Sequence, residues 1–217
     1  MKNKIEIIQP DDWHVHFREG EMLKAITHYS SRINKRCIAM PNTEIPITNS
    51  IKAEDYRAEI KKNSKSDNFE ILIPCYLTEN LDLYDFKQAL ERNIFIGAKL
   101  YPTNATTNSS FGVSKIENIY PALEILEKKN KILLCFDEMQ AGFGRTGELF
   151  GYMHYNVEPD LIACGKGSSS SLPLSIVLGK SEVMDLPDIG SMSSTHSANP
   201  MVCVAGKANL EALIEDG

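Results

Sequence analysis

The sequence predicts an α/β fold, and the pattern of apolar residues carries most of that prediction. Through the first 130 residues, short apolar runs alternate with amphipathic segments. The runs span about four to eight residues and end at turn or polar residues, as buried strands do. The segments between them repeat apolar residues every three or four positions, which is typical of helices packed on a sheet. This alternation predicts parallel strands joined by right-handed crossovers.

The elements of this first part follow one another in a regular order. We expect strands at 5–10, 36–42, 69–77 and 95–102, and helices at 21–33, 51–63, 82–93 and 116–130. The last of these helices has Pro121 near its start. Four such units are half of the eight that close a β/α barrel, and a full barrel typically needs about 250 residues.

The remaining residues predict further strands at 131–138, 160–166 and 174–180. A glycine-rich loop at 141–152 and a serine-rich loop at 167–173 separate them, and 202–217 predict a helix that stops soon after it begins. Because half a barrel leaves an exposed strand edge, we expect the strands at 131–136 and 161–164 to extend the first sheet. The result would be one open, mostly parallel sheet of about six or seven strands.

Composition changes sharply near residue 130. Residues 1–130 hold 18 basic and 18 acidic side chains, whereas residues 131–217 hold 5 and 11 and so carry the whole net charge of −6. Ten of the 13 glycines also lie in the second segment. We therefore predict two domains, 1–130 and 131–217.

Several classes of protein are disfavoured by composition. The negative charge argues against nucleic acid as a partner, and no apolar run is long enough for a membrane span. The first residues do not look like a signal peptide, because acidic residues follow within a dozen positions. Five scattered cysteines without a C-x-x-C pair are typical of reduced thiols, so we expect a cytoplasmic protein.

A first group of polar residues follows the predicted strands. His14 and His16 stand two residues apart, so on a strand both imidazoles face the same side and can reach one ion. Such a pair is also typical of ordinary polar residues at a strand end. Arg18, Asn42 and Lys99 lie at comparable strand ends, which form the active face of a β/α barrel. A lysine that ends an apolar strand is costly unless its charge is paired or chemically altered.

The stretches DDWHVHFREGEML, MPNTEIPIT and GAKLYPTNATTNSSFGV resemble the dihydroorotases, metal-dependent amidohydrolases of pyrimidine biosynthesis built on a β/α barrel. The resemblance covers essentially all of residues 1–130. It implies that His14 and His16 bind zinc and that Lys99, once carbamylated, bridges two zinc ions. Such ions would activate a water molecule and polarise the amide carbonyl of dihydroorotate.

The same resemblance implies a substrate site. Arg18 and Asn42 would hold the substrate carboxylate, and Thr106 and Thr107 would belong to a loop that closes over it. The chain departs from the family at Phe111, where a histidine is common. It also lacks, after residue 130, the family's two later histidines and catalytic aspartate. Two protein ligands make an incomplete zinc site, because three or four are usual.

A second group of polar residues follows the later strands. Asp137 ends an apolar strand and Lys166 ends the next between two glycines. Taken singly, they are typical of a capping carboxylate and a solvent-exposed lysine. The glycines of 141–147 lack the spacing of a dinucleotide-binding loop.

The stretches LLCFDEMQAGFGRTGELFGYMHYNVEPDLIACGKG, LPLSIVLGK and SSTHSANP resemble the class III aminotransferases, which depend on pyridoxal 5'-phosphate (PLP). The resemblance covers 131–217, a fragment of the PLP-transferase large domain. It implies that Lys166 forms the Schiff base, that Asp137 pairs with the pyridine nitrogen, that Gln140 lies near the ring, and that Thr195 binds the cofactor phosphate, usually across a dimer interface.

This second resemblance is also incomplete. The family commonly has a glycine-rich run after the lysine, whereas this chain has Ser168 to Ser171. Nothing in residues 1–130 resembles the family's main phosphate-binding turn or its ring-stacking aromatic residue.

Three functional hypotheses follow: a zinc amidohydrolase acting on dihydroorotate, a PLP-dependent transaminase acting on an amino donor, and a chimeric product without activity because both sites are incomplete. The join would lie near residues 130–134, where both families have a strand with a double leucine. A single natural enzyme with an unusual second half is the alternative interpretation.

Overall fold

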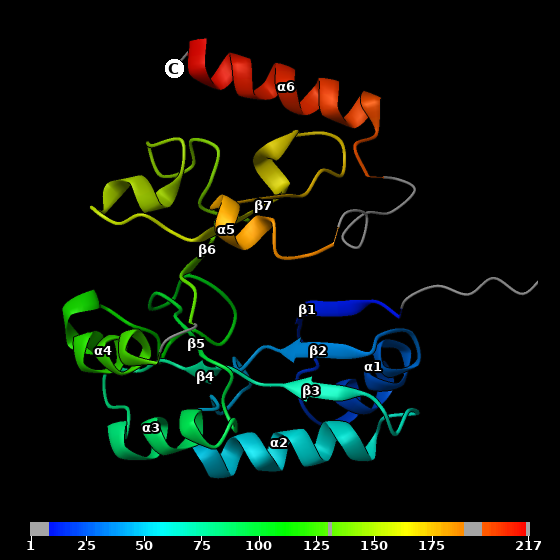
Figure 1. Ribbon diagram of the computed structural model, residues 1–217, viewed down its shortest axis with the longest axis vertical. Coiled ribbons are helices and arrows are strands. Elements are labelled where there is room, and N and C mark those ends of the chain that lie inside the picture. The colour runs from blue at the N-terminus through cyan, green and yellow to red at the C-terminus, as the bar shows by residue number, and fades with distance from the viewer. Residues whose placement is uncertain (1–8, 130–131, 189–196, 216–217) are drawn as a thin grey trace, which may run out of the picture. The chain divides into compact units, whose positions relative to one another are not determined.

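The computed structural model describes residues 9–129, 132–188 and 197–215, and the chain divides into two compact units, Met1–Ile132 and Leu133–Gly217. Each unit has its own strands and helices (Figure 1). The strand predicted at 5–10 lies almost entirely outside the described residues. Within the described part of the chain, no helix is long and apolar enough to cross a membrane.

The strands of the first unit run parallel to their neighbours. They are β1 (Asp11–Val15), β2 (Arg36–Ala39), β3 (Glu70–Leu72), β4 (Cys75–Tyr76) and β5 (Ala98–Lys99). The first three form one sheet in the order β1-β2-β3, and β4 pairs with β5 in another. The α/β class and the parallel pairing that the alternation predicts are confirmed.

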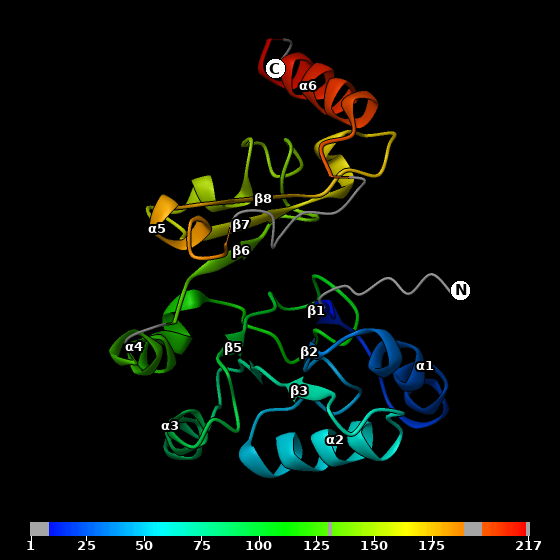
Figure 2. The same ribbon diagram turned by 45° about the vertical axis from the view of Figure 1, so that its right-hand side comes forward.

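The helices between these strands lie in an arc outside them (Figure 2). They are α1 (Gly20–Ile33), α2 (Ser50–Lys62), α3 (Leu83–Glu91) and α4 (Tyr120–Lys128), the last preceded by the 3₁₀ helix η1 (Ile116–Ile119). Two of them begin at side chains that accept backbone N–H groups of the first turn: Asn49 for α2 and Asp82 for α3. Pro121 stands in the first turn of α4, where a helix needs no N–H donor.

The core of the first unit lies between these helices and the strands. Its fully buried side chains include Leu23 of α1, Ile60 of α2 and Phe86 of α3, which pack with strand and loop residues such as Ile73 and Phe95. Burying each side chain of this size contributes about 1.5–3 kcal/mol. The helical spacing of these apolar residues is what the sequence analysis used to predict the helices.

The prediction of one open sheet of six or seven strands is wrong for the described residues, which form three separate sheets. Pro74 interrupts the run predicted as a strand at 69–77, because its nitrogen has no hydrogen to donate. Before it, β3 pairs with β2; after it, Cys75 donates to the Gly97 carbonyl at 3.0 Å and β4 pairs with β5 instead.

The second unit has a sheet of its own. Strand β6 (Cys135–Asp137) pairs in parallel with β7 (Leu161–Cys164), and β8 (Ile176–Gly179) returns antiparallel to β7. The strand order is β6-β7-β8, so β7 is paired on both sides. Short helices η2 (Gly151–His154), η3 (Lys166–Ser168) and α5 (Ser181–Met184) connect them.

The final helix, α6, runs from Pro200 to Glu215. It is helical over all 16 of these residues, so the expectation that this helix stops soon after it begins is wrong. Asn199 starts it by accepting the N–H of Met201 at 3.0 Å, and the alanines, leucine and glutamates that follow are good helix formers.

Candidate functional site

The two histidines of the first group point at each other. His14 lies in β1 and His16 follows its last residue, and their Nε2 atoms are 3.2 Å apart. Two nitrogens bound to one tetrahedral zinc at about 2.0–2.1 Å would be separated by about this distance. The pair therefore fits two ligands of a single zinc ion.

The surroundings of His16 keep its imidazole neutral. Burial lowers the pKa of His16 to about 4, and the positive charge of Arg18 adds to the effect. Smaller contributions from His14 and Lys99 lower the pKa further, while Asn42 acts in the opposite direction. The buried Nδ1 of His16 has no hydrogen-bond partner. A neutral imidazole has the free lone pair that a metal requires.

Among the described residues, no group of three or more His, Cys, Asp or Glu side chains could hold a metal ion, so none of these types adds a third ligand to the pair there. Lys99 ends β5, where its ammonium lies 5.6 Å from the centre of the Tyr101 ring, and its charge reaches His16. These donors fit zinc in kind, and within residues 9–129, 132–188 and 197–215 they supply only part of a coordination shell.

Asn42 connects the end of β2 to the loop that follows β5. Its side chain is 2% exposed and donates from Nδ2 to the Thr107 carbonyl at 2.9 Å. Its own carbonyl accepts hydrogen bonds from Arg18 and from Asn108, each at 3.1 Å. Its Oδ1 is buried without a partner. The structure therefore brings Arg18, Asn42 and the Thr107 backbone together and leaves one amide oxygen of Asn42 without a partner.

The loop after β5 is closed at its base. Val113 donates to the Tyr101 carbonyl at 2.8 Å, and Thr103 donates to the Val113 carbonyl at 3.1 Å. Gly112 is required there, because a Cβ would lie 2.3 Å from the Tyr101 oxygen. The side chains of Thr106 and Thr107 are exposed near the tip, as is Phe111, which stands where the resemblance expects histidine.

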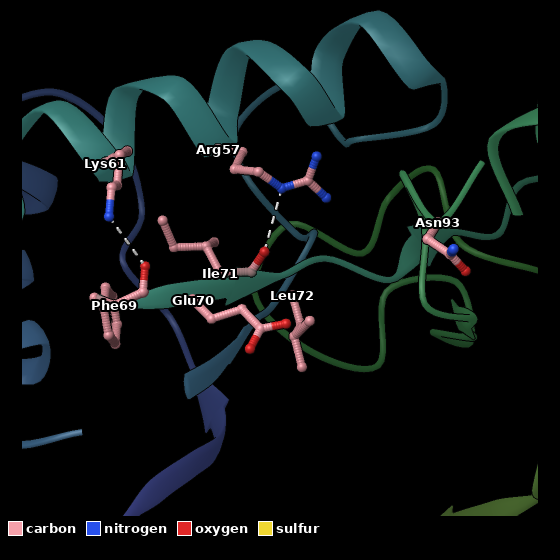
Figure 3. Close-up of a pocket in the computed structure, with 7 residues that line it drawn as sticks. All are labelled: Arg57, Lys61, Phe69, Glu70, Ile71, Leu72 and Asn93. Carbon is pink, nitrogen blue, oxygen red and sulfur yellow. Dashed lines mark hydrogen bonds between the residues drawn. The ribbon is translucent and has the colours of Figure 1, made fainter. Parts of the chain in front are cut away.

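A pocket of about 410 Å³ lies elsewhere in this unit, beside the amino-terminal end of β3 (Figure 3). Its two cationic side chains are already engaged with backbone carbonyls. Arg57 donates to Ile71 at 3.2 Å and to Ile94 at 2.6 Å, and Lys61 donates to Phe69 at 3.4 Å. Arg57 thus joins β3 to the segment between α3 and β5, and we interpret this pocket as structural.

In the second unit, the residues of the second group lie at the same end of neighbouring parallel strands. Asp137 is the last residue of β6, and Lys166 follows β7 by two residues. Lys166 has a φ of 40°, in the left-handed region, and its Nζ donates to Oε1 of Gln140 at 3.3 Å. Lys166 and Asp137 are both exposed, so a cofactor would have access to them. Thr195 lies outside the described residues.

Glu138 is a residue that the sequence analysis missed. It is 2% exposed, and its carboxylate accepts the N–H groups of Gly151 at 2.9 Å and Tyr152 at 2.8 Å. These hydrogen bonds connect Glu138 to the far end of the glycine-rich loop, and Gln140 lies in the segment between them. The signal was a second acidic residue directly after Asp137, at a position where the strand alternation turns the side chain inward.

Comparisons with known proteins find similarity to two enzyme families. A family profile described as "Aminotransferase class-III" matches residues 112–217. Curated dihydroorotases match the N-terminal part: that of Photorhabdus laumondii is 46% identical over 138 residues, and that of Buchnera aphidicola is 47% identical over 137. The chain resembles two enzyme families, one along each part.

Solved structures of both families are also similar to this chain. The dihydroorotase of Campylobacter jejuni aligns over 61% of this chain and 38% of its own, with a TM-score of 0.54 and 34% identity. The ornithine δ-aminotransferase of Plasmodium falciparum aligns over 67% of this chain and 36% of its own, with a TM-score of 0.51 and 27% identity.

The chain covers only part of each relative. It spans 39% of the length of both curated dihydroorotases and 46% of the Toxoplasma gondii ornithine aminotransferase, which aligns over 89% of this chain at 24% identity with a TM-score of 0.54. At that identity, the last match speaks for the fold alone.

Proposed function

We propose that residues 1–130 carry the zinc- and substrate-binding half of a dihydroorotase site and that residues 131–217 carry the cofactor-lysine part of a PLP-dependent aminotransferase site. Neither part, by this proposal, has all the groups that turnover needs. The observation that carries it is the His14–His16 pair, with Nε2 atoms 3.2 Å apart and no third ligand of the usual types among the described residues.

In the first site, each residue has a part that its geometry supports. His14 and His16 would hold zinc through neutral imidazoles, and Lys99, after carbamylation, would supply the bridging oxygens. Zinc supplies Lewis-acid polarisation of the amide carbonyl when it is bound. Arg18 would form the charged hydrogen bonds to the carboxylate of dihydroorotate. The resemblance places Asn42 at the same carboxylate, but its Nδ2 donates to the Thr107 carbonyl, so we propose that its Oδ1 would accept an N–H of the substrate ring instead.

The decisive experiment measures hydrolysis of dihydroorotate by the purified chain with excess zinc, beside a full-length dihydroorotase as a positive control. We expect no detectable turnover, because the remaining zinc ligands and a general base are missing. Turnover within about tenfold of a typical enzyme's ~10 per second would refute the proposal.

A second candidate function is transamination by the second unit. It is favoured by the position of Asp137 and Lys166 at the ends of adjacent strands and by the contact of Lys166 with Gln140. Asp137 would keep the pyridine nitrogen protonated, and Lys166 would hold the cofactor covalently. PLP supplies an electron sink for the substrate carbanion when it is bound.

Titration with PLP separates this candidate from an inactive chimera. Wild type and Lys166→Ala would be treated with borohydride and mapped by peptide mass. We expect weak labelling of Lys166 and no response to amino donors, since the main phosphate-binding turn is missing. Micromolar binding that depends on Lys166 and responds to donors would establish transamination instead.

The chimeric origin has a test of its own. Genomic DNA read across codons 125–140 in one continuous molecule would show a single uninterrupted coding frame if the join exists in the cell. A break within that window would show two genes joined in error.

A further inference from the structure

The serine run after Lys166 is held by its own hydroxyl groups. Ser168 Oγ donates to the Leu174 carbonyl at 2.7 Å, and Ser169 Oγ donates to the Leu172 carbonyl. Ser168 and Ser169 are only 2% and 3% exposed. Where the aminotransferase pattern has glycines, this chain therefore has a loop fastened to its own backbone.

Asn209 fastens the same loop from outside. Its Nδ2 donates to the Gly167 carbonyl at 2.8 Å and, at 3.4 Å, to that of Ser168. Its Oδ1 accepts the hydroxyl of Ser170 at 2.6 Å. One side chain of α6 thus satisfies three groups of the four residues that follow Lys166.

α6 lies close to the loop at Gly206, three residues before Asn209 and so on the same helix face. A Cβ on Gly206 would lie 2.5 Å from Leu174 Cδ2 and 3.5 Å from the Ser168 carbonyl. The helix backbone is therefore near the loop at the face from which Asn209 reaches it. Leu174 is also where Ser168 bonds, so helix and serine loop meet at one place.

Lys166 lies in a turn held from two sides. On one side, Gln140 accepts a hydrogen bond from the ammonium of Lys166. Phe143 of the same loop packs close to Gly167, where an added Cβ would lie 3.2 Å from the Phe143 Cβ. On the other side stands Asn209. A non-glycine residue at a φ of 40° is strained, so the turn keeps this conformation only while its surroundings hold it.

We propose that Asn209 is a positioning residue for Lys166, acting with the serine loop as a latch that keeps the lysine turn in its left-handed conformation. The inference rests on the proposed role of Lys166 in holding PLP. It goes beyond it by assigning the rigidity of the turn to α6 and to serines that replace glycines. The latch does not touch the cofactor; it acts through the backbone of Gly167 and Ser168.

The test uses the full chain and two independent measurements. The first is hydrogen exchange of the peptide covering 165–172. The second is borohydride trapping with PLP, reported as the label at Lys166 relative to that at Lys180. For Asn209→Ala, we expect about tenfold faster exchange and about tenfold less relative label, since two donated hydrogen bonds are lost.

Asn209→Asp distinguishes positioning from packing. It keeps the volume and the oxygen facing Ser170 but lacks the N–H groups that reach Gly167 and Ser168. We expect it to behave like Asn209→Ala. If it behaves like wild type, packing alone holds the turn and the proposal fails.

Lys207→Ala is the matched control, because Lys207 lies on the same helix in an exposed pair with Glu211. It should leave both measurements unchanged. If wild type shows no label at Lys166, the PLP proposal fails while hydrogen exchange still judges the latch. Unchanged exchange in Asn209→Ala would overturn the latch whatever the label shows.

Discussion

The Nε2 atoms of His14 and His16 face each other at 3.2 Å, a separation set by two side chains that project from the same end of β1. Residues two apart on a strand share a face, so the backbone alone brings the imidazoles together. The pairing of β1 with β2 holds this strand in place, so the arrangement depends on both strands.

We predict that the chain binds one zinc ion weakly through this pair. His14→Ala or His16→Ala should weaken binding at least about tenfold, because even outer-shell changes at metal sites cost 10–100-fold. His28→Ala, a change within α1, is the control and should have no effect. Isothermal titration calorimetry measures the stoichiometry; tight binding of two ions by wild type would contradict the prediction.

Asn42 should matter for stability as well as for ligand binding. Replacing it with alanine removes the bond from Nδ2 to Thr107, and we expect about 1–2 kcal/mol less stability. Hydrogen exchange should rise in 103–112, the loop that this bond fastens. Chemical denaturation tests the first effect, with the exposed Asn68→Ala as control. Equal stability of both variants would show that the loop closes without Asn42.

The carboxylate of Glu79 should make the first unit sensitive to acid. Hydrogen bonds from Ser114 and Asn118 lower the pKa of Glu79 to about 2, from an ordinary value of 4.5. A carboxylate whose pKa is lower in the folded state than in the unfolded state stabilises the fold at pH values above its unfolded-state pKa. That contribution should disappear as the pH falls from about 4.5 toward 2.

Thermal unfolding between pH 2 and 6 checks this expectation. Glu79→Gln should lower the melting temperature at pH 6 and reduce its dependence on pH below 4.5. Glu117→Gln, at an exposed position of η1, should follow wild type. Parallel pH profiles for wild type and Glu79→Gln would show that these hydrogen bonds contribute nothing to stability.

Glu138 should be critical for the second unit. Glu138→Ala leaves the part-buried N–H groups of Gly151 and Tyr152 without their acceptor, and we expect a loss of about 1–2 kcal/mol in stability. We expect the loop at 139–152 to open and trypsin to cut faster after Arg145. The control is Glu148→Gln, which removes an exposed charge from the same loop. Cleavage at the wild-type rate in Glu138→Ala would exclude this role.

The helices and most strands could be predicted because their spacing of apolar residues is local. The predicted range 51–63 and the observed α2 differ by one residue at each end, for example. The division into three sheets could not be predicted from local spacing, because it depends on which strand reaches a free backbone edge. Pro74 is the one local signal for the break, because a residue without an N–H cannot donate to a strand ladder.

The site residues also differ in whether the local sequence could predict their positions. His14 and His16 were predictable because strand geometry places them together over two residues. Asn42 and Thr107 lie 65 positions apart, and their hydrogen bond follows from the fold. Glu138 was missed because its partners are backbone groups 13 and 14 residues further on, which no side-chain pattern reveals.

The parallel ladders of the first unit have a consequence for synthesis on the ribosome. Asp11 pairs with Arg36, Arg36 with Glu70, and Cys75 with Ala98, so these strands find their partners early in the chain. Domains generally fold in order of emergence, at about 5–20 residues per second. The sheets of this unit therefore have several seconds to assemble before the second unit leaves the exit tunnel. We expect the first unit to begin folding before the residues after 132 have been released.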